Sequence, residues 1–174
     1  SVAVVSDAGT PGISDPGALL AAALAAAEVP LHPIPGPSSV IAALSISGFP
    51  ASEFTFLGFL AVKGKERREK IEKIKACLHT VVFFEAPHRI MKTFIDLTAN
   101  DVSIKDRLCV CCRELTKKHE EIKRGTVQDV LTWLQETQAA HEVCNLPLLL
   151  FTSIFMFICC CVSSAGRKWG GYSR

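Results

Sequence analysis

A short apolar run followed at once by a polar loop constrains the fold of this chain more than any other feature. The run is Val2–Val5, and the loop at residues 6–17 consists largely of Asp, Gly, Thr, Pro and Ser. This order predicts a buried strand that ends among backbone donors and carboxylates. Open α/β sheets bind ligands at the carboxyl ends of their strands. The segment therefore indicates an α/β fold with a ligand site here, and the alternative is a strand followed by ordinary turns.

Strands and helices are predicted to alternate along the rest of the chain. Apolar spacing with Gly, Pro and capping residues predicts strands at 31–34, 80–84 and 108–112, and helices at 18–29, 38–47 and 126–138. Two further helices are predicted from their apolar faces, Ile71, Ile74 and Leu78 in one and Ile90, Phe94 and Leu97 in the other. The alternation indicates the α/β class.

The pattern divides the chain into three parts. Residues 49–60, with their Pro and Gly, are interpreted as a crossing between two domains. We assign residues 1–52 to a first α/β domain, 53–142 to a second, and 143–174 to a separate tail rich in hydrophobic residues and Cys. Thr126 is expected to cap the last helix of the second domain.

Five sequence blocks occur in an order that resembles a known family. They lie at residues 7–17, 33–44, 58–68, 83–89 and 113–117. Together they resemble the ribosomal RNA small subunit methyltransferase I family of the tetrapyrrole methylase superfamily, and the resemblance covers residues 2–137. It implies a two-domain tetrapyrrole-methylase-like fold with S-adenosylmethionine bound in the cleft between the domains. It also implies 2′-O-methylation of a cytidine in small-subunit ribosomal RNA, and a homodimer in intact members.

The resemblance also implies which residues lie beside the methyl donor. From the first domain these are the loop residues Asp7, Ala8, Gly9 and Thr10, together with Ser38 and Ser39 of the neighbouring loop; from the second they are Phe84 and Cys112. A carboxylate is chemically suited to a cationic sulfonium donor. Methyl transfer is an in-line displacement, so positioning is the main task of these residues.

Residues 85–89 concentrate a carboxylate, an imidazole and a guanidinium at the end of a predicted strand. Glu85 and His88 are both candidates for the base that accepts the ribose hydroxyl proton, and the sequence does not rank them. Arg89 is suited to an RNA phosphate. The alternative is a helix-entry turn in which His88 and Arg89 bond to backbone carbonyls.

Charge gives a local indication of an RNA contact, although the net charge of +2 gives none. Lys63, Lys65, Arg67 and Arg68 are interpreted as loop residues that bind phosphates. Because Glu66, Glu69 and Glu72 alternate with basic residues at helical spacing, a solvated helix face with internal ion pairs is the alternative.

The eight cysteines do not indicate a metal site or a disulfide framework. Cys109 and Cys111 are expected on one face of a strand and Cys112 on the other. Reduced, buried thiols favour a reducing compartment. With the family resemblance, this gives the cytoplasm or an organelle that has its own ribosomes.

Both ends differ from the expected family pattern. We expect the chain to lack an upstream Gly-rich turn of the donor site and, at the other end, the last strand of the second domain. The apolar run Leu146–Val162 admits three interpretations: a membrane span, a buried element, or a segment not selected for folding, such as translated intron sequence. We favour the third, and so expect this chain by itself to have little activity.

Two other functions are weighed against ribosomal RNA methylation. A relative in the superfamily could methylate a tetrapyrrole or a protein side chain, but such relatives usually carry Gly-Asp-Pro where this chain has residues 7–11, and they lack the block at 85–89. The other alternative is a non-catalytic truncated product whose tail associates with a membrane.

Overall fold

The chain folds into two compact units. The computed structural model describes residues 2–6, 9–99, 101–143 and 155–160. The first unit is Ser1–Ala42 and the second is Ala43–Arg174, so the division precedes the boundary predicted after residue 52.

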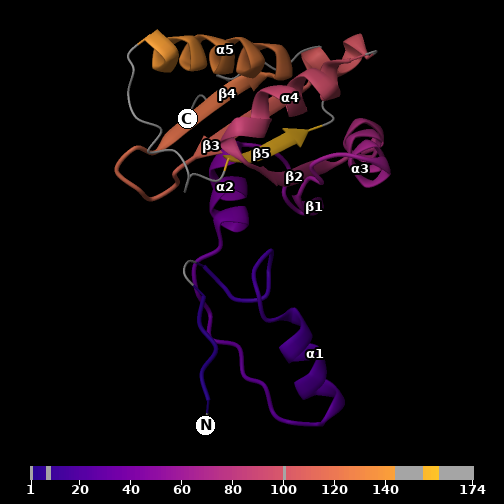
Figure 1. Cartoon of the computed structure of the whole chain (residues 1–174), viewed down its shortest axis with the longest axis vertical. Coiled ribbons are helices and arrows are strands. Elements are labelled where there is room, and N and C mark those ends of the chain that lie inside the picture. Colours follow the sequence, from indigo (N-terminus) through magenta and orange to yellow (C-terminus); the bar gives the residue numbers. More distant parts are fainter. Residues whose placement is uncertain (1, 7–8, 100, 144–154, 161–174) are drawn as a thin grey trace. The chain divides into compact units, whose positions relative to one another are not determined.

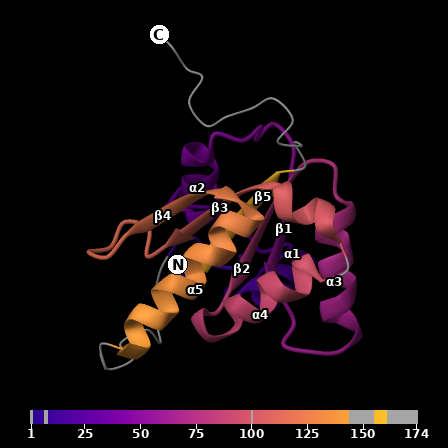
Figure 2. The same cartoon turned by 90° about the horizontal axis from the view of Figure 1, so that it is seen from above.

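The second unit is built on a five-stranded sheet with strand order β1-β2-β5-β3-β4 (Figures 1 and 2). Its elements are β1 (Phe54–Phe59), α3 (Lys65–Ala76), β2 (Thr80–Glu85), α4 (Pro87–Thr98), the 3-10 helix η1 (Val102–Asp106), β3 (Leu108–Arg113), β4 (Glu121–Thr126), α5 (Val127–Val143) and β5 (Phe155–Cys160). Strand β2 is parallel to β1, whereas β5 is antiparallel to both β2 and β3. Strands β2 and β3 therefore run in the same direction and end at the same edge.

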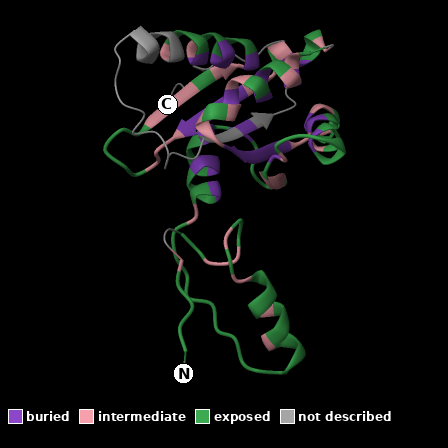
Figure 3. Ribbon diagram, viewed as in Figure 1, coloured by how far each residue is buried: buried purple, intermediate pink, exposed green. Residues whose placement is uncertain are grey.

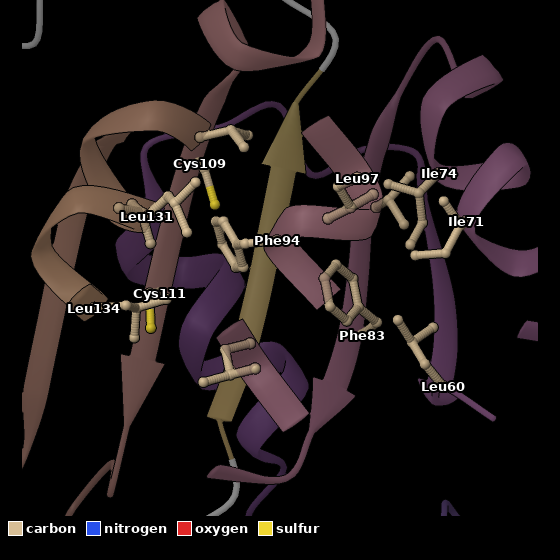
Figure 4. Close-up of a cluster of buried hydrophobic side chains, with 14 residues drawn as sticks. Leu60, Ile71, Ile74, Phe83, Phe94, Leu97, Cys109, Cys111, Leu131 and Leu134 are labelled. Carbon is tan, nitrogen blue, oxygen red and sulfur yellow. The ribbon is translucent and has the colours of Figure 1, made fainter. Parts of the chain in front are cut away.

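One face of this sheet is covered by α3, α4 and α5. Alternate residues of β2 and β3, such as Phe83 and Cys111, meet apolar side chains of these helices in a buried cluster (Figure 4). The predicted helix face of Ile90, Phe94 and Leu97 is confirmed as buried, and α5 likewise buries Val127, Val130, Leu131 and Leu134. Cys109 and Cys111 belong to this cluster and Cys112 does not, as strand alternation predicts.

Strand β5 overturns the prediction that the second domain lacks its last strand. Phe155–Cys160 inserts between β2 and β3, and Ile158 is fully buried in register with Val82 and Val110. A strand with neighbours on both sides has partners for its backbone groups along both edges, and the apolar sequence fits this central position in the sheet. The interpretation of a buried element therefore agrees with the structure of these six residues. Residues 146–154, 161 and 162 of the run lie outside the described residues.

The first unit holds α1 (Ala18–Ala26) and the start of α2 (Ser39–Ser47), which continues into the second unit. Both helices were predicted, but the strands predicted at 2–5 and 31–34 are wrong. Val2 is 95% exposed and Ile34 82% exposed, and neither segment pairs with another described strand (Figure 3). An isolated extended segment has no partner for its backbone groups, so its apolar sequence alone does not make it a strand.

Two smaller predictions also need correction, and one strand was missed. The segment predicted as an interdomain crossing contains β1, and β4 was not predicted. Leu78 is 88% exposed because α3 ends at Ala76 and Cys77 is already extended. Among the described residues, no helix has the length and apolar character needed to cross a bilayer.

Candidate functional site

Two loops of the first unit, distant in sequence, meet where the donor site was predicted. The Thr10 hydroxyl donates a hydrogen bond to the Pro37 carbonyl oxygen at 3.2 Å. A Cβ atom added at Gly9 would lie 3.4 Å from the same oxygen. The structure thus brings Gly9 and Thr10 beside the residue that precedes Ser38. Asp7 and Ala8 lie outside the described residues.

The backbone of these loops favours a small ligand. Gly9 has φ +77°, which places it in the left-handed region that glycine adopts most easily. Ser6 donates to the Gly9 carbonyl at 2.9 Å and so fixes this turn. Ser38 caps the helix by accepting from the Ile41 N–H at 3.4 Å, and Ser39 is exposed. Exposed hydroxyl and backbone groups at a helix start are able to hydrogen-bond a polar ligand.

In the second unit, Phe84 and Cys112 lie at the same level of the sheet, because both pair with Met156 of β5. Both are buried. The Phe84 ring packs on Phe56 and Phe59, with ring centroids 5.0 and 5.3 Å away. Burial raises the pKa of the Cys112 thiol to about 11, so the thiol is protonated at neutral pH. These side chains form an apolar wall and supply no charged group.

Glu85 is the centre of a buried ion-pair network. Its side chain is fully buried, and one oxygen, Oε1, lies 2.7 Å from Arg89 Nη2 and accepts from the Ala86 N–H at 2.9 Å. The other, Oε2, accepts from the Thr93 hydroxyl at 2.8 Å and lies 3.5 Å from Arg67 Nη1. Both oxygens are engaged by neighbouring groups, so Glu85 is a structural anion in this network, and the geometry disfavours it as the proton acceptor.

Arg67 is a structural cation and not an RNA contact, which corrects the prediction. It lies within α3 and is only 5% exposed. Its Nη2 donates to Asp96 Oδ2 at 2.7 Å and to the Thr93 hydroxyl at 2.9 Å. Its Nη1 donates to the Ala61 carbonyl at 3.1 Å. The guanidinium donors are engaged by these groups and by Glu85, so a phosphate could bind Arg67 only by displacing one of these partners.

Arg89 and His88 follow each other in the first turn of α4 but differ in environment. Arg89 pairs with Glu85 and donates from Nη1 to the Leu60 carbonyl at 3.2 Å, which agrees with the alternative of a helix-entry turn. Its Nε is buried with no hydrogen-bond partner among the described residues. His88 is exposed and has no ion pair or hydrogen bond in the described part of the chain. Of the two candidate bases, only His88 is accessible.

The other three basic residues predicted to bind RNA near α3, Lys63, Lys65 and Arg68, are exposed. Lys63 lies in the loop before α3, whereas Lys65 and Arg68 belong to the helix and were wrongly placed in the loop. Lys65 pairs with Glu69 at 3.6 Å, and Lys70 with Glu66 at 3.4 Å, so part of this surface is a solvated helix face with internal pairs.

Among the described residues, no cluster of acidic, His or Cys residues could hold a metal ion.

Two residues of the network were missed in the sequence. Thr93 and Asp96 follow Arg89 by four and seven positions, which places them on the same face of a helix. Polar residues at this spacing inside an apolar helix are the signal that could have found them.

Comparison with known proteins identifies the family. Residues 1–131 match the family model described as Tetrapyrrole (Corrin/Porphyrin) Methylases. The chain belongs to the tetrapyrrole methylase family. Its fold is similar to solved structures: the methyltransferase CobJ has a TM-score of 0.60 at 16% identity, covering 93% of this chain and 64% of that one. Uroporphyrin-III-C-methyltransferase from Thermus thermophilus has a TM-score of 0.54 at 18% identity, covering 88% and 61%. The predicted α/β tetrapyrrole-methylase-like fold is confirmed.

Within the tetrapyrrole methylases, the chain is similar to proteins named ribosomal RNA small subunit methyltransferase I. The relative from Xylella fastidiosa is 47% identical over 142 residues, covering 82% of this chain and 50% of the relative. The relative from Vibrio cholerae is 45% identical over 136 residues, covering 78% and 46%. That from Synechocystis sp. is 41% identical over 144 residues, covering 83% and 51%. The predicted resemblance is confirmed, and the chain spans about half the length of the curated relatives it matches.

Proposed function

We propose that this chain takes part in S-adenosylmethionine-dependent 2′-O-methylation of a cytidine ribose in small-subunit ribosomal RNA. The observation that carries the proposal is the 41% to 47% identity to relatives whose name states ribosomal RNA small subunit methyltransferase I. A solved tetrapyrrole methylase with a TM-score of 0.51, the Thermus thermophilus uroporphyrin enzyme, holds S-adenyl homocysteine. That complex supports the choice of methyl donor.

The residues of the first unit fit such a donor. S-adenosylmethionine supplies a methyl group activated by a sulfonium cation. The turn at Gly9 has no side chain in the space beside Pro37, and Thr10 holds the two loops together. We propose that these loops and the serines at 38 and 39 bind the donor through backbone and hydroxyl groups, with Asp7 balancing its positive charge. Positioning of this kind supplies most of the rate enhancement for a displacement.

We propose His88 as the group that accepts the ribose hydroxyl proton. It is the exposed one of the two candidates, whereas the oxygens of Glu85 are engaged by Arg89, Thr93 and the Ala86 N–H. His88→Ala is expected to lower kcat by about 10² to 10⁴ and leave donor affinity unchanged. His119→Ala, a change at another exposed histidine, is the control and is expected to have no effect.

The test uses a chimera, because the chain spans about half of its relatives. The aligned 136-residue segment of the Vibrio cholerae relative is replaced by the matching part of this chain. With labelled S-adenosylmethionine and small-subunit RNA, we expect label in the RNA at one cytidine whose 3′ bond resists alkaline hydrolysis. Label in a base, a protein or a tetrapyrrole, or no label where the intact relative gives it, would overturn the proposal.

A second variant tests the donor loops in the same chimera. Thr10→Val removes the hydrogen bond to Pro37, and we expect donor affinity to fall about fivefold to tenfold. Thr132→Val is the matched control, because Thr132 is exposed on α5 and bonds only to its own helix at Gln128. Equal donor affinity in both variants, measured by calorimetry, would contradict the placement of the donor at these loops.

A further inference from the structure

A groove with several basic residues lies along α3 and α4. It has a volume of about 530 Å³, and its charged lining residues include Lys63, Arg67, Arg68, Lys75, Lys92 and Asp96. Both helices pack on the same face of the sheet. The groove therefore belongs to the second unit alone, and its walls come from two elements that the core holds in place.

The charges in the groove do not cancel. Its two acidic residues are already neutralised: Asp96 pairs with Arg67 at 2.7 Å, and Glu72 pairs with Lys75 at 3.2 Å. Lys63, Arg68 and Lys92 have no ion pair in the described part of the chain. Three positive charges are thus left over, and they come from the loop before α3, from α3 and from α4. A concave surface with excess charge of one sign concentrates counter-ions of the other sign.

The floor of the groove is rigid. Arg67 joins α3 to α4 through Asp96 and Thr93, and it also contacts the buried Glu85. It holds the Ala61 carbonyl as well, which fixes the start of the loop that carries Lys63. Arg89 holds the neighbouring Leu60 carbonyl. Arg67 and Arg89 therefore position the basic residues that surround the groove, and their own charges are balanced by Glu85 and Asp96.

The composition of the groove indicates which part of a nucleic acid it contacts. Among the residues that the structure describes, none of those lining the groove is aromatic and able to stack on a base, and Ile71 and Ala99 are the apolar members. At its mouth, a Cβ atom added at Gly64 would meet no atom within 4 Å, and no side chain caps the first turn of α3. Lysine and arginine without aromatic residues are suited to phosphates and not to base recognition.

We propose that this groove binds the phosphate backbone of the substrate RNA, with Lys63, Arg68 and Lys92 as the contacts. The proposal rests on the proposed function, because it names the surface that holds that RNA. It assigns an RNA contact to Lys92, which the sequence did not indicate, and it leaves out Lys65, whose ammonium pairs with Glu69. Contacts to phosphates orient the RNA without reading its sequence.

The experiment measures binding of the full 174-residue chain to a fluorescein-labelled fragment of small-subunit ribosomal RNA. Fluorescence anisotropy is recorded from 50 to 200 mM salt. Lys92→Glu is expected to weaken binding about tenfold at the lowest salt and to lower the slope of log K against log salt by about 1. Arg68→Glu should do the same, and Lys92→Arg should restore binding.

The matched control is Lys73→Glu. Lys73 is exposed on α3 and does not line the groove, so this variant makes the same charge change on the same unit. We expect less than a threefold effect from it. Equal weakening by Lys73→Glu and Lys92→Glu would show that RNA binding depends only on the net charge, and would contradict the assignment of the groove as the RNA site. Unchanged binding by Lys92→Glu would overturn it as well.

Failure of the groove and failure of the proposed function give different results. If the chimera described above methylates RNA and Lys92→Glu has no effect on RNA binding, the groove is wrong and the function stands. If the chimera does not methylate RNA but Lys92→Glu weakens RNA binding selectively, the groove stands as an RNA site and the methylation is wrong. Donor affinity should be equal in all groove variants.

Discussion

The two units contain apolar segments of similar kind, but these segments have opposite fates. Val2–Val5 in the first unit is extended and exposed, with Val5 85% exposed, whereas Phe155–Cys160 in the second is a central strand. Neither sequence is a better strand former than the other. The difference lies in partners, because β5 enters a gap between β2 and β3, and Val2–Val5 meets no described strand.

The same contrast applies to the helices. α1 is almost entirely Ala and Leu, yet it has no buried residue, and Leu19 is 89% exposed. α4 has a mixed sequence, yet it buries Ile90, Phe94 and Leu97 against the sheet. The Ala and Leu sequence of α1 favours a helix, but a helix of nine residues is only marginally stable without packing, and a core needs a sheet to pack on. Stability in this chain is therefore expected to reside in the second unit.

The largest effect should come from a charge at the centre of the sheet. Ile158→Asp buries a carboxylate at a fully buried position between β2 and β3, and we expect it to lower the free energy of unfolding by about 4 kcal/mol or more. The control in the other unit is Val5→Asp, at a position 85% exposed, with an expected effect within about 0.5 kcal/mol. Urea unfolding followed by circular dichroism measures both. Equal effects would show that β5 is not part of the fold.

The next largest effect should come from the buried ion pairs. Glu85→Ala leaves Arg67 and Arg89 buried without their shared carboxylate, and we expect a loss of about 3 to 5 kcal/mol. Glu66→Ala is the control, because Glu66 makes an exposed helix pair with Lys70 that contributes only about 0.3 to 0.5 kcal/mol. If Glu85→Ala lowers the free energy of unfolding by less than about 1 kcal/mol, then water reaches Arg67 and Arg89 in place of the carboxylate, and the region around Glu85 is accessible to solvent.

These comparisons show what the sequence can and cannot predict. Periodicity predicted β2, β3 and the buried faces of α4 and α5, because these elements bury one face or run continuously through the core. It did not distinguish β5 from an unselected apolar tail, or Val2–Val5 from a strand, because pairing is a non-local property. The basic cluster shows the same limit. Arg67 and Arg68 are neighbours in sequence, yet one is buried and the other is exposed.

Alkaline pH should destabilise the second unit through Cys112. Burial raises its pKa from 9.0 to about 11, so the folded chain keeps the proton after the unfolded chain has lost it. The stabilisation is fully present below pH 9 and is lost as the pH rises to about 11. Urea unfolding at pH 8 and pH 10.5 should show a smaller fall in stability for Cys112→Ala than for the parent chain. Identical falls would mean that other groups, such as lysines and the buried Cys111 thiol, whose pKa burial also raises, account for the pH dependence.

The smallest effects compare the helix caps of the two units. In the second unit Thr126 and Asp129 bond reciprocally: the Asp129 N–H donates to the Thr126 hydroxyl at 3.1 Å, and the Thr126 N–H donates to Asp129 at 2.8 Å. In the first unit Ser38 accepts a single longer bond of 3.4 Å from Ile41. We expect Thr126→Ala to lower the free energy of unfolding by about 1 kcal/mol, because α5 packs on the core and its cap is part of the cooperative fold. Ser38→Ala should lower it by less than about 0.5 kcal/mol, because α2 begins in the unit that lacks a sheet. Thermal unfolding of both variants tests this order, and a larger effect from Ser38 would show that the first unit unfolds together with the second.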